Sequence, residues 1–264
     1  MGSEWWVEFF DELYHEIYSM LQTEDRNRAE AQFIAEILEL GPGSRLLDLG
    51  CGFARVATHL ASMGVEVLCL DFSEKLLSIA LRRIYDVGVD DRVHLVRGDM
   101  RATSLRGSSV DAAIIWFTTF GFFSDEENER VLDQLAHVVK PGGRVAIDLF
   151  NALRALHTAI HSDAEGRRPG LTWWSEEGKY LVLESIEFDV MTMRSRSRRV
   201  VIDRESGAKI ADRLIDIRMY MPHEISKMLA SRGFEIEKIL GNYRGEPYRP
   251  LSPRMIIVAR KAAQ

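Results

Sequence analysis

Two kinds of hydrophobic pattern alternate along the middle of the chain. Five short runs are continuously apolar, as strands buried on both faces of a sheet should be; they are Leu46–Leu49, Val65–Leu70, Val93–Val96, Val110–Trp116 and Val145–Phe150. Between them, residues 54–63, 73–87 and 125–139 have apolar positions at helical spacing. This order predicts βα units around a mostly parallel, doubly wound, Rossmann-like sheet of the α/β class.

The two ends of the chain extend this plan. Residues 4–21 have the spacing of one amphipathic helix, and a second helix over 25–40 ends at Gly41-Pro42-Gly43. Near the other end, a helix over 222–232 precedes two apolar runs, Phe234–Leu240 and Met255–Ala259. We therefore expect seven strands in the sheet, with an antiparallel strand at its C-terminal end.

Residues 171–220 have a different pattern. Apolar and polar residues partly alternate in four segments, Leu171–Ser175, Tyr180–Met191, Arg196–Asp203 and Ala208–Tyr220, with turns at Glu177-Gly178 and Ser206-Gly207. Such alternation is typical of antiparallel hairpins. We therefore divide the chain into a core, residues 1–151 and 213–264, and a β-rich insertion, residues 152–212.

Composition narrows the classes of protein. With 264 residues, 46% apolar and 28% charged, the chain is neither disordered nor collagen-like. Its net charge of −6 does not favour nucleic acid or anionic membrane as a partner. Two scattered cysteines, no signal-peptide pattern and no run of 18 apolar residues predict a cytoplasmic protein without a membrane span.

The first apolar run leads into a glycine-containing turn, Asp48-Leu49-Gly50-Cys51-Gly52. Glycines at the start of a helix let the backbone approach a ligand closely. The dinucleotide fingerprint G-x-G-x-x-G has a third glycine, where this chain has Arg55. This difference argues against a nicotinamide or flavin dinucleotide, and Asp48 favours a ligand with a cationic group.

The turn resembles the first motif, (D/E)-x-G-x-G, of the class I S-adenosylmethionine-dependent methyltransferases. Other landmarks follow in the family's order up to Lys140-Pro141-Gly142-Gly143, and the resemblance covers about two-thirds of the chain. It implies S-adenosyl-L-methionine as the cofactor. It also implies a cofactor loop that contains Asp48, Gly50, Cys51 and Gly52.

The ends of the next three strands supply further cofactor candidates. Asp71 ends the second run, where a carboxylate accepts hydrogen bonds from ribose hydroxyls; alternatively, it caps the helix that begins near Ser73. The resemblance places Asp99 at the adenine amino group and Met100 against the ring, the alternative being a plain loop aspartate. Phe72 and Trp116 complete this set of strand-end candidates.

The first two helices look similar to a lid found in relatives that act on small molecules. In that family a leading helix covers the cofactor with a tyrosine, and an arginine contacts the cofactor carboxylate. Tyr14 and Tyr18, four residues apart on one helix face, and Arg28 match these positions. The alternatives are that both tyrosines pack on the sheet and that Arg28 is an exposed helix residue. In this interpretation residues 1–40 form the lid, and the insertion covers the substrate pocket.

The predicted reaction is methyl transfer to a nitrogen or oxygen of a small molecule by in-line displacement. A neutral sulfur leaves, so no acid is needed, and the sequence shows no indispensable acid–base constellation. Thr119, Tyr220 and Tyr243 are candidate catalytic residues. These three, with Phe120 and Arg244, are also the candidate acceptor-binding residues, because all five should converge on the carboxyl edge of the sheet.

Two features leave alternatives open. The run Arg194-Ser195-Arg196-Ser197-Arg198-Arg199 fits a polyanion, as in an RNA or protein methyltransferase, or else the solvated face of a hairpin. His157 and His161 have the spacing of a metal pair, but no third ligand is near, so we predict no metal site. A non-catalytic nucleotide-binding protein is the third possibility, and the sequence does not indicate an oligomeric state.

Overall fold

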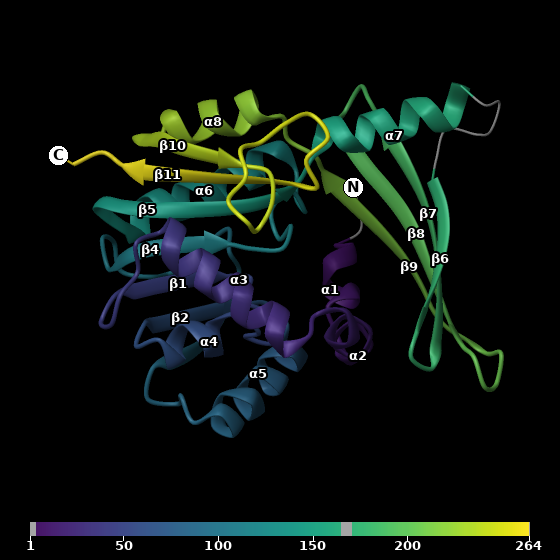
Figure 1. Cartoon of the computed structure of the whole chain (residues 1–264), viewed down its shortest axis with the longest axis horizontal. Helices are drawn as coiled ribbons and strands as arrows, with labels where there is room; N and C mark the ends of the chain where they lie inside the picture. The colour runs from purple at the N-terminus through teal and green to yellow at the C-terminus, as the bar shows by residue number, and fades with distance from the viewer. Residues whose placement is uncertain (1–3, 165–170, 264) are drawn as a thin grey trace.

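The computed structural model describes residues 4–164 and 171–263, without the side chains of 159–164 and 171. The chain forms two sheets with the N-terminal helices between them (Figure 1). No helix in the described ranges is long and apolar enough to cross a membrane. The larger sheet positions the candidate site, and the smaller one packs against the N-terminal helices that cover this site.

The larger sheet has seven strands in the order β10-β11-β5-β4-β1-β2-β3. Their bounds are Arg45–Leu49 (β1), Glu66–Asp71 (β2), Val93–Arg97 (β3), Val110–Ile115 (β4), Val139–Phe150 (β5), Phe234–Leu240 (β10) and Arg254–Lys261 (β11). All pairs between β1 and β5 are parallel, whereas β11 runs antiparallel to both of its neighbours. The predicted α/β class and the C-terminal antiparallel strand are confirmed.

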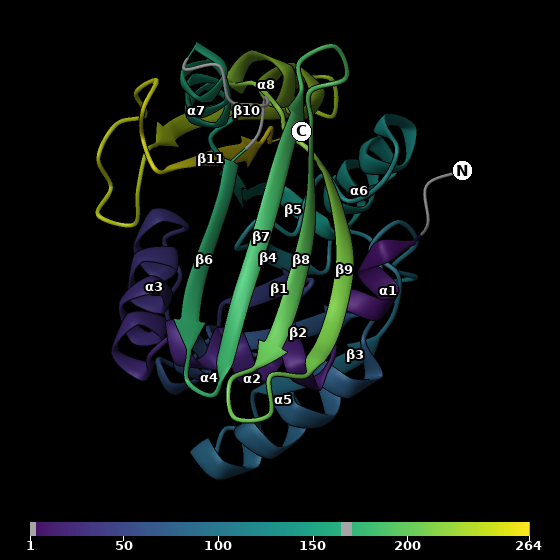
Figure 2. The ribbon, with the colours of Figure 1, turned by 90° about the vertical axis from the view of Figure 1, so that its right-hand side faces the viewer.

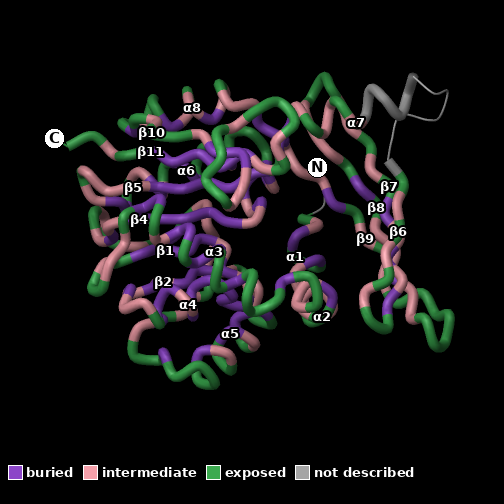
Figure 3. The backbone as a smooth tube through the Cα atoms, in the orientation of Figure 1, coloured by how far each residue is buried: buried purple, intermediate pink, exposed green. Residues whose placement is uncertain are grey.

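Helices cover both faces of this sheet and bury it. On one face lie α3 (Glu24–Ile37), α4 (Ala57–Ser62) and α5 (Glu74–Val87), and on the other lie α6 (Asp125–Val138) and α8 (Pro222–Ala230). Strands β1 and β4 and the second half of β5 are buried on both faces, as the purple tube in Figure 3 shows, whereas the edge strand β3 is partly exposed. A hydrophobic core therefore lies between each face of the sheet and the helix layer that covers it.

The predicted β-rich segment forms a separate antiparallel sheet. Its strands are β6 (Leu171–Glu177), β7 (Tyr180–Asp189), β8 (Arg194–Asp203) and β9 (Lys209–Arg218), paired in sequence order (Figure 2). Strand β9 extends beyond residue 212, where we placed the boundary of the insertion. Helix α7 (Ala152–Ala164), which we did not predict, precedes the sheet and packs against β6 and β7.

The N-terminal segment is two helices, so the prediction of one helix over 4–21 is wrong. Helix α1 (Trp5–Phe9) ends before Asp11, and the Asp11 side chain accepts a hydrogen bond from the Tyr14 backbone N–H to start α2 (Glu12–Leu21). An N-cap aspartate favours a new helix start over a continuous helix. The resulting corner lets α1 lie along β9 while α2 packs on the inner face of the second sheet.

Candidate functional site

A cavity lies at the carboxyl edge of β1, β2 and β4, where open α/β sheets bind ligands. The N-terminal segment covers this cavity with the side chains of Trp6, Phe10 and Tyr14. Gln22, the residue after α2, also lines the cavity. The predicted residues that line it are Tyr14, Asp48, Gly50, Cys51, Gly52, Asp71, Phe72, Asp99, Met100, Trp116 and Thr119. The fold thus brings together ten of the twelve predicted cofactor residues and one acceptor candidate.

The loop after β1 brings backbone into direct contact with the cavity. Gly50 has φ +83°, and a Cβ at this position would overlap the side-chain methyl group of Thr119. A side chain is therefore excluded on both conformational and steric grounds. The loop exposes its backbone to a ligand while Thr119, from the segment after β4, packs directly against it.

Asp48 is a buried carboxyl group beside this loop. It is 2% exposed, and within the described residues no group donates a hydrogen bond to it. Desolvation raises its pKa to about 7, although the nearby Arg55 opposes this shift. A ligand with a cationic group would stabilise the ionised form of Asp48.

Asp71 is fixed at the end of β2 by two backbone donors. The Gly52 N–H donates to one carboxylate oxygen at 2.7 Å, and the Ser73 N–H donates to the other at 2.8 Å. Ser73, not Asp71, caps α5, because its hydroxyl accepts from the Leu76 N–H. Burial raises the pKa of Asp71, while these bonds lower it. Each oxygen keeps lone pairs for hydroxyl donors.

The end of β3 forms a second side of the cavity. The Asp99 carboxylate is already engaged by Arg101, whose Nη2 lies 2.7 Å from Oδ2. Arg101 holds the pKa of Asp99 below its ordinary value against desolvation. Met100 lies against the Gly50 position, and Phe72 packs edge-on against Trp6 at 4.7 Å between ring centroids. Met100, Phe72 and Trp6 thus give this side of the cavity an apolar lining.

Two polar residues that sequence reasoning missed carry unsatisfied groups at the cavity. Gln22 and Arg55 both line it, and both are more than nine-tenths buried. Both amide atoms of Gln22, and Nη2 of Arg55, have no hydrogen-bond partner among the described residues. Buried polar groups without partners are costly, so these atoms indicate a polar ligand. From the sequence, Arg55 is interpreted only as the residue that stands where the dinucleotide fingerprint has its third glycine. An arginine near the start of a helix and close to Asp48 is the signal that could have identified it as a ligand-binding residue.

Arg55 is held by a buried network behind the cavity. Its Nη1 lies 2.7 Å from Glu30 and 3.2 Å from the Asn27 side-chain oxygen, both on α3. The indole N–H of Trp116 donates to the same Glu30 at 3.1 Å. The network leaves Nη2 as the unpaired end of the guanidinium group.

The lid candidates separate into one residue at the cavity and two away from it. Tyr14 lines the cavity, whereas Tyr18 stacks on Tyr14 at 4.3 Å and accepts a hydrogen bond from Arg199 of β8. Arg28 lies outside the cavity on the exposed side of α3 and pairs with Asp25. The prediction that Arg28 faces the cofactor is wrong in geometry, because that helix turns Glu30 and Asn27 inward instead.

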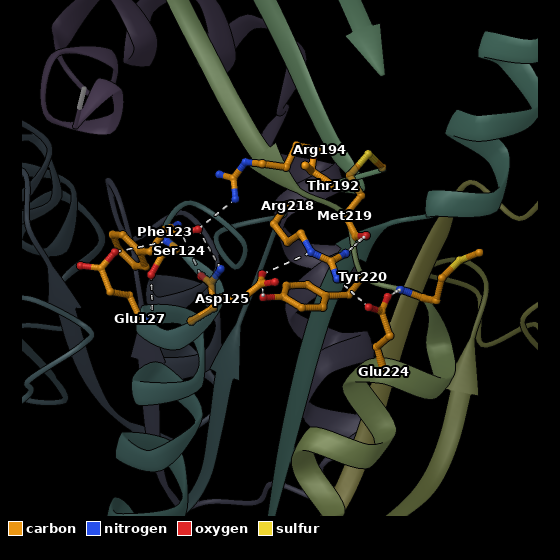
Figure 4. A network of polar contacts seen from close by, with 12 residues as sticks. Phe123, Ser124, Asp125, Glu127, Thr192, Arg194, Arg218, Met219, Tyr220 and Glu224 are labelled. Carbon is orange, nitrogen blue, oxygen red and sulfur yellow. Dashed lines mark hydrogen bonds and ion pairs between the residues drawn. The ribbon is translucent and has the colours of Figure 1, made fainter. Parts of the chain in front are cut away.

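Four acceptor candidates do not line the cavity. Phe120 and Tyr220 pack against each other in the core beside α6, and Arg244 is exposed. Tyr220 donates to Asp125, and Arg218 bridges Asp125 and Glu224 in the network drawn in Figure 4. Burial raises the pKa of Tyr220. This network joins the second sheet to α6 and α8. Tyr220, Arg218 and Glu224 do not line the cavity, whereas Phe123 at the other end of the network does.

Tyr243 lies behind the cavity wall. Its hydroxyl donates to Asp148 at 2.7 Å, and its ring stacks on Trp116 at 5.5 Å. Burial raises the pKa of Tyr243 well above its ordinary value. Tyr243 therefore does not line the cavity, whereas Trp116, on which it stacks, does.

The donor set fits S-adenosylmethionine. Asp48 suits an ammonium group, Arg55 and Gln22 suit a carboxylate, Asp71 suits ribose hydroxyls, and Met100 with Phe72 suits a flat base. The unpaired atoms of Gln22 and Arg55 are the observation that carries this fit. In the described part of the chain, no three His, Cys, Asp or Glu side chains group to hold a metal ion.

Comparisons with known proteins agree with this geometry. Residues 46–143 match the model of the "Methyltransferase domain" family. A demethylmenaquinone methyltransferase of Clavibacter sepedonicus is 38% identical over 109 residues, which are 41% of this chain and 42% of that protein. The chain thus spans about half the length of the curated relatives that it matches.

Solved structures show the same fold over nearly the whole chain. The CcbJ methyltransferase of Streptomyces caelestis has a TM-score of 0.77 at 22% identity, covering 90% of both chains. CalS10, an amino pentose methyltransferase of Micromonospora echinaspora, has a TM-score of 0.66 at 20% identity, covering 95% of this chain and 97% of its own. Residues 46–143 thus match a methyltransferase domain family, and the chain as a whole has the fold of these solved methyltransferases.

Proposed function

We propose that this chain is an S-adenosylmethionine-dependent methyltransferase that methylates a nitrogen or oxygen of a small molecule. The observation that carries the proposal is the convergence of Asp48, Asp71 and the unpaired groups of Gln22 and Arg55 on one cavity. Together these groups match three parts of the same cofactor: its ammonium group, its carboxylate and its ribose hydroxyls. A nicotinamide dinucleotide offers no amino-acid group for Asp48, Gln22 and Arg55.

The residues of the chain act mainly by binding, orienting and excluding water. Asp48, Asp71, Arg55 and Gln22 would hold S-adenosylmethionine, which would supply an activated methyl group for in-line transfer to an acceptor lone pair, with a neutral sulfur as the leaving group. Trp6, Phe10 and Tyr14 close the cavity with aromatic surface, which removes competing water. Thr119 and Trp116 fix the wall beside the glycine loop and so limit how an acceptor enters.

The kinds of side chain at the cavity bear on the acceptor. No histidine whose side chain the structure describes lines the cavity. An amine needs only to lose its proton to water before transfer, whereas a hydroxyl gains more from a base. This favours a nitrogen acceptor within the proposed class.

Charge distribution supports a small acceptor over a polyanion. Arg194 and Arg196 pair with Asp216, and Arg198 pairs with Asp212, both on the neighbouring strand β9. The guanidinium groups of these three arginines are therefore paired with carboxylates across strands. Relatives named for demethylmenaquinone and an amino pentose are consistent with a small acceptor.

Calorimetry with S-adenosylmethionine and its demethylated product tests cofactor binding, and no heat at millimolar ligand would refute the proposal. Transfer of radiolabelled methyl groups into pools of small amines and phenols then tests catalysis. Binding without transfer into any pool would favour the non-catalytic nucleotide-binding alternative. Transfer only into RNA or protein would overturn the small-molecule assignment.

The two cysteines bear on the compartment in which we propose that the chain acts. Cys51 and Cys69 are both free and buried, and burial raises the pKa of each thiol. Neither is a reactive thiolate nor a disulfide partner, which agrees with a reducing compartment such as the cytoplasm.

A further inference from the structure

Two consecutive residues after β4 have a backbone conformation that L-amino acids rarely adopt. Phe117 has φ +57° and Thr118 has φ +66°. A β-branched residue such as threonine is especially disfavoured there, and each such residue costs about 1–3 kcal/mol. The next residue, Thr119, is the one whose methyl group packs on Gly50. A strained pair thus directly precedes a contact that shapes the cavity.

Asp148 of β5 holds both strained residues. Its carboxylate accepts from the Phe117 backbone N–H at 3.0 Å, and its backbone carbonyl accepts from the Thr118 N–H at 3.0 Å. The side chain of Asp148 is fully buried. One residue therefore fixes two successive peptide groups of the strained segment.

Arg254 of β11 completes this clamp. Its Nε and Nη2 each donate to Asp148 at 2.8 Å, and Nη2 also donates to the Thr118 hydroxyl at 2.7 Å. The guanidinium group is 11% exposed. Breaking a buried ion pair of this kind leaves an uncompensated charge, so both partners are needed together.

Tyr243 links the clamp to the cavity wall. Its hydroxyl donates to the same Asp148 carboxylate, and its ring stacks on Trp116. Trp116 in turn donates to Glu30, the partner of Arg55. A continuous chain of contacts therefore runs from Arg254 to the unpaired guanidinium nitrogen at the cavity.

We propose that Asp148 and Arg254 are positioning residues that hold Phe117 and Thr118 in the left-handed conformation and thereby seat Thr119 and Trp116 at the cofactor cavity. The assignment rests on the proposed function, since the seat matters only if the cavity binds the cofactor. It also gives Tyr243 a positioning role in place of a direct contact with the acceptor. Neither Asp148 nor Arg254 lines the cavity, so both act through the segment they hold.

The test compares affinity for the demethylated cofactor product, measured by calorimetry, with the melting temperature. Asp148→Asn keeps the shape but weakens the clamp, and we expect about tenfold weaker binding. Adding Thr118→Gly in the same chain should recover at least about threefold, because glycine adopts this conformation without strain. Thr118→Gly alone should change affinity by less than about threefold, since the two bonds of Asp148 to the backbone of the segment do not involve the Thr118 side chain.

Ser108→Gly is the matched control. Ser108 also has a positive φ, +51°, but lies in a turn away from the cavity. In the Asp148→Asn chain it should restore no affinity, even where it raises the melting temperature. Should Asp148→Asn not fold, Tyr243→Phe removes a single bond to Asp148 and should weaken binding by about threefold, again recovered by Thr118→Gly.

The outcomes separate the two proposals. If the unmodified chain does not bind the product, the proposed function is wrong and this assignment falls with it. If the unmodified chain binds and Asp148→Asn, or Tyr243→Phe in its place, binds equally well, only the clamp is overturned. Equal recovery by Thr118→Gly and Ser108→Gly would also overturn it, because that result indicates general stability and not positioning.

Discussion

The two sheets place their charged residues in opposite ways. At the carboxyl edge of the seven-stranded sheet, Asp48 and Arg55 are buried and Asp71 is half-buried, and all three face a cavity with part of their bonding capacity unused. On the outer face of the four-stranded sheet, Arg198 and Asp212 pair with each other across strands in solvent. Unsatisfied buried charge indicates a ligand site, whereas satisfied exposed charge indicates a solvated surface.

The inner face of the second sheet is intermediate between these cases. Arg199 pairs with Glu184 and also donates to Tyr18 of α2, and Arg213 binds Asp11 between α1 and α2. The Tyr180 hydroxyl donates to Glu16 of α2. These charges connect the sheet to the helices that close the cavity. The second sheet therefore contributes to the site indirectly, through the lid.

The largest expected effect is at Asp71. Replacing it with alanine should weaken cofactor binding tenfold or more, because roughly 1.5–3 kcal/mol of charge-assisted hydrogen bonding is lost. Calorimetry of the demethylated product measures this directly. Asp212→Ala, which removes a carboxylate from the second sheet, is the matched control and should bind normally. Unchanged affinity in Asp71→Ala would remove Asp71 from the site.

Asp48 should make cofactor affinity depend on pH. Its pKa of about 7 means that most of the carboxyl groups are protonated at pH 6 and ionised at pH 8. A cationic ligand prefers the ionised form, so affinity should rise by up to about tenfold across this range, with a proton released on binding. Calorimetry in two buffers of different ionisation enthalpy measures the released proton.

Asp48→Asn is the control for this prediction. It also tests how much the buried Asp48 carboxyl group lowers the free energy of unfolding. The folded pKa lies above the unfolded one, so the folded chain keeps a proton that the unfolded chain has lost between about pH 4 and 7. The free energy of unfolding therefore falls as pH rises through this window. Asp48→Asn should unfold at a higher temperature than the unmodified chain at pH 8, and show no pH-linked affinity. A pH dependence that survives the substitution would assign it to another group.

The sequence predicted the first region far better than the second. Continuous apolar strands and the Asp48-Leu49-Gly50-Cys51-Gly52 turn depend on local sequence, so the mostly parallel sheet and most cavity residues followed from them. Arg28 was misplaced because helical spacing alone does not say which face meets the cavity. The sequence did not identify Trp6, Phe10 and Gln22, because these side chains meet the cavity only through the corner that the chain makes at Asp11.

Long-range contacts explain the other misses. The four hairpin strands and their turns were predicted, since alternation is a local signal. Tyr220 and Tyr243 were expected at the cavity because both follow or precede strands at the correct edge. Their hydroxyls instead meet Asp125 and Asp148, which lie 95 residues away along the chain in each case. No periodicity in the sequence encodes such a partner.

The inner face of the second sheet should affect the lid. Arg213→Ala removes two bonds to Asp11 and one to the Phe9 carbonyl, so hydrogen exchange of amides in residues 5–21 should accelerate. Cofactor dissociation, followed by stopped flow, should become about threefold faster, a small change because the ion pair is partly solvated. Arg196→Ala, on the outer face of the same sheet, should leave both rates unchanged. Equal exchange in the two variants would contradict a role for the sheet in holding the lid.

The smallest effect is expected on the outer face of the second sheet. Arg198 is 62% exposed and pairs with Asp212, and exposed pairs contribute little because water and salt screen them. Arg198→Ala should therefore lower the melting temperature by less than about 2 °C and leave cofactor affinity unchanged. The same variant tests the polyanion alternative, since cross-strand pairing should leave no salt-dependent retention on RNA for either chain. Retention by the unmodified chain that is lost in Arg198→Ala would show that the arginine run binds phosphate despite its pairing, and the contrast between the two sheets would no longer hold.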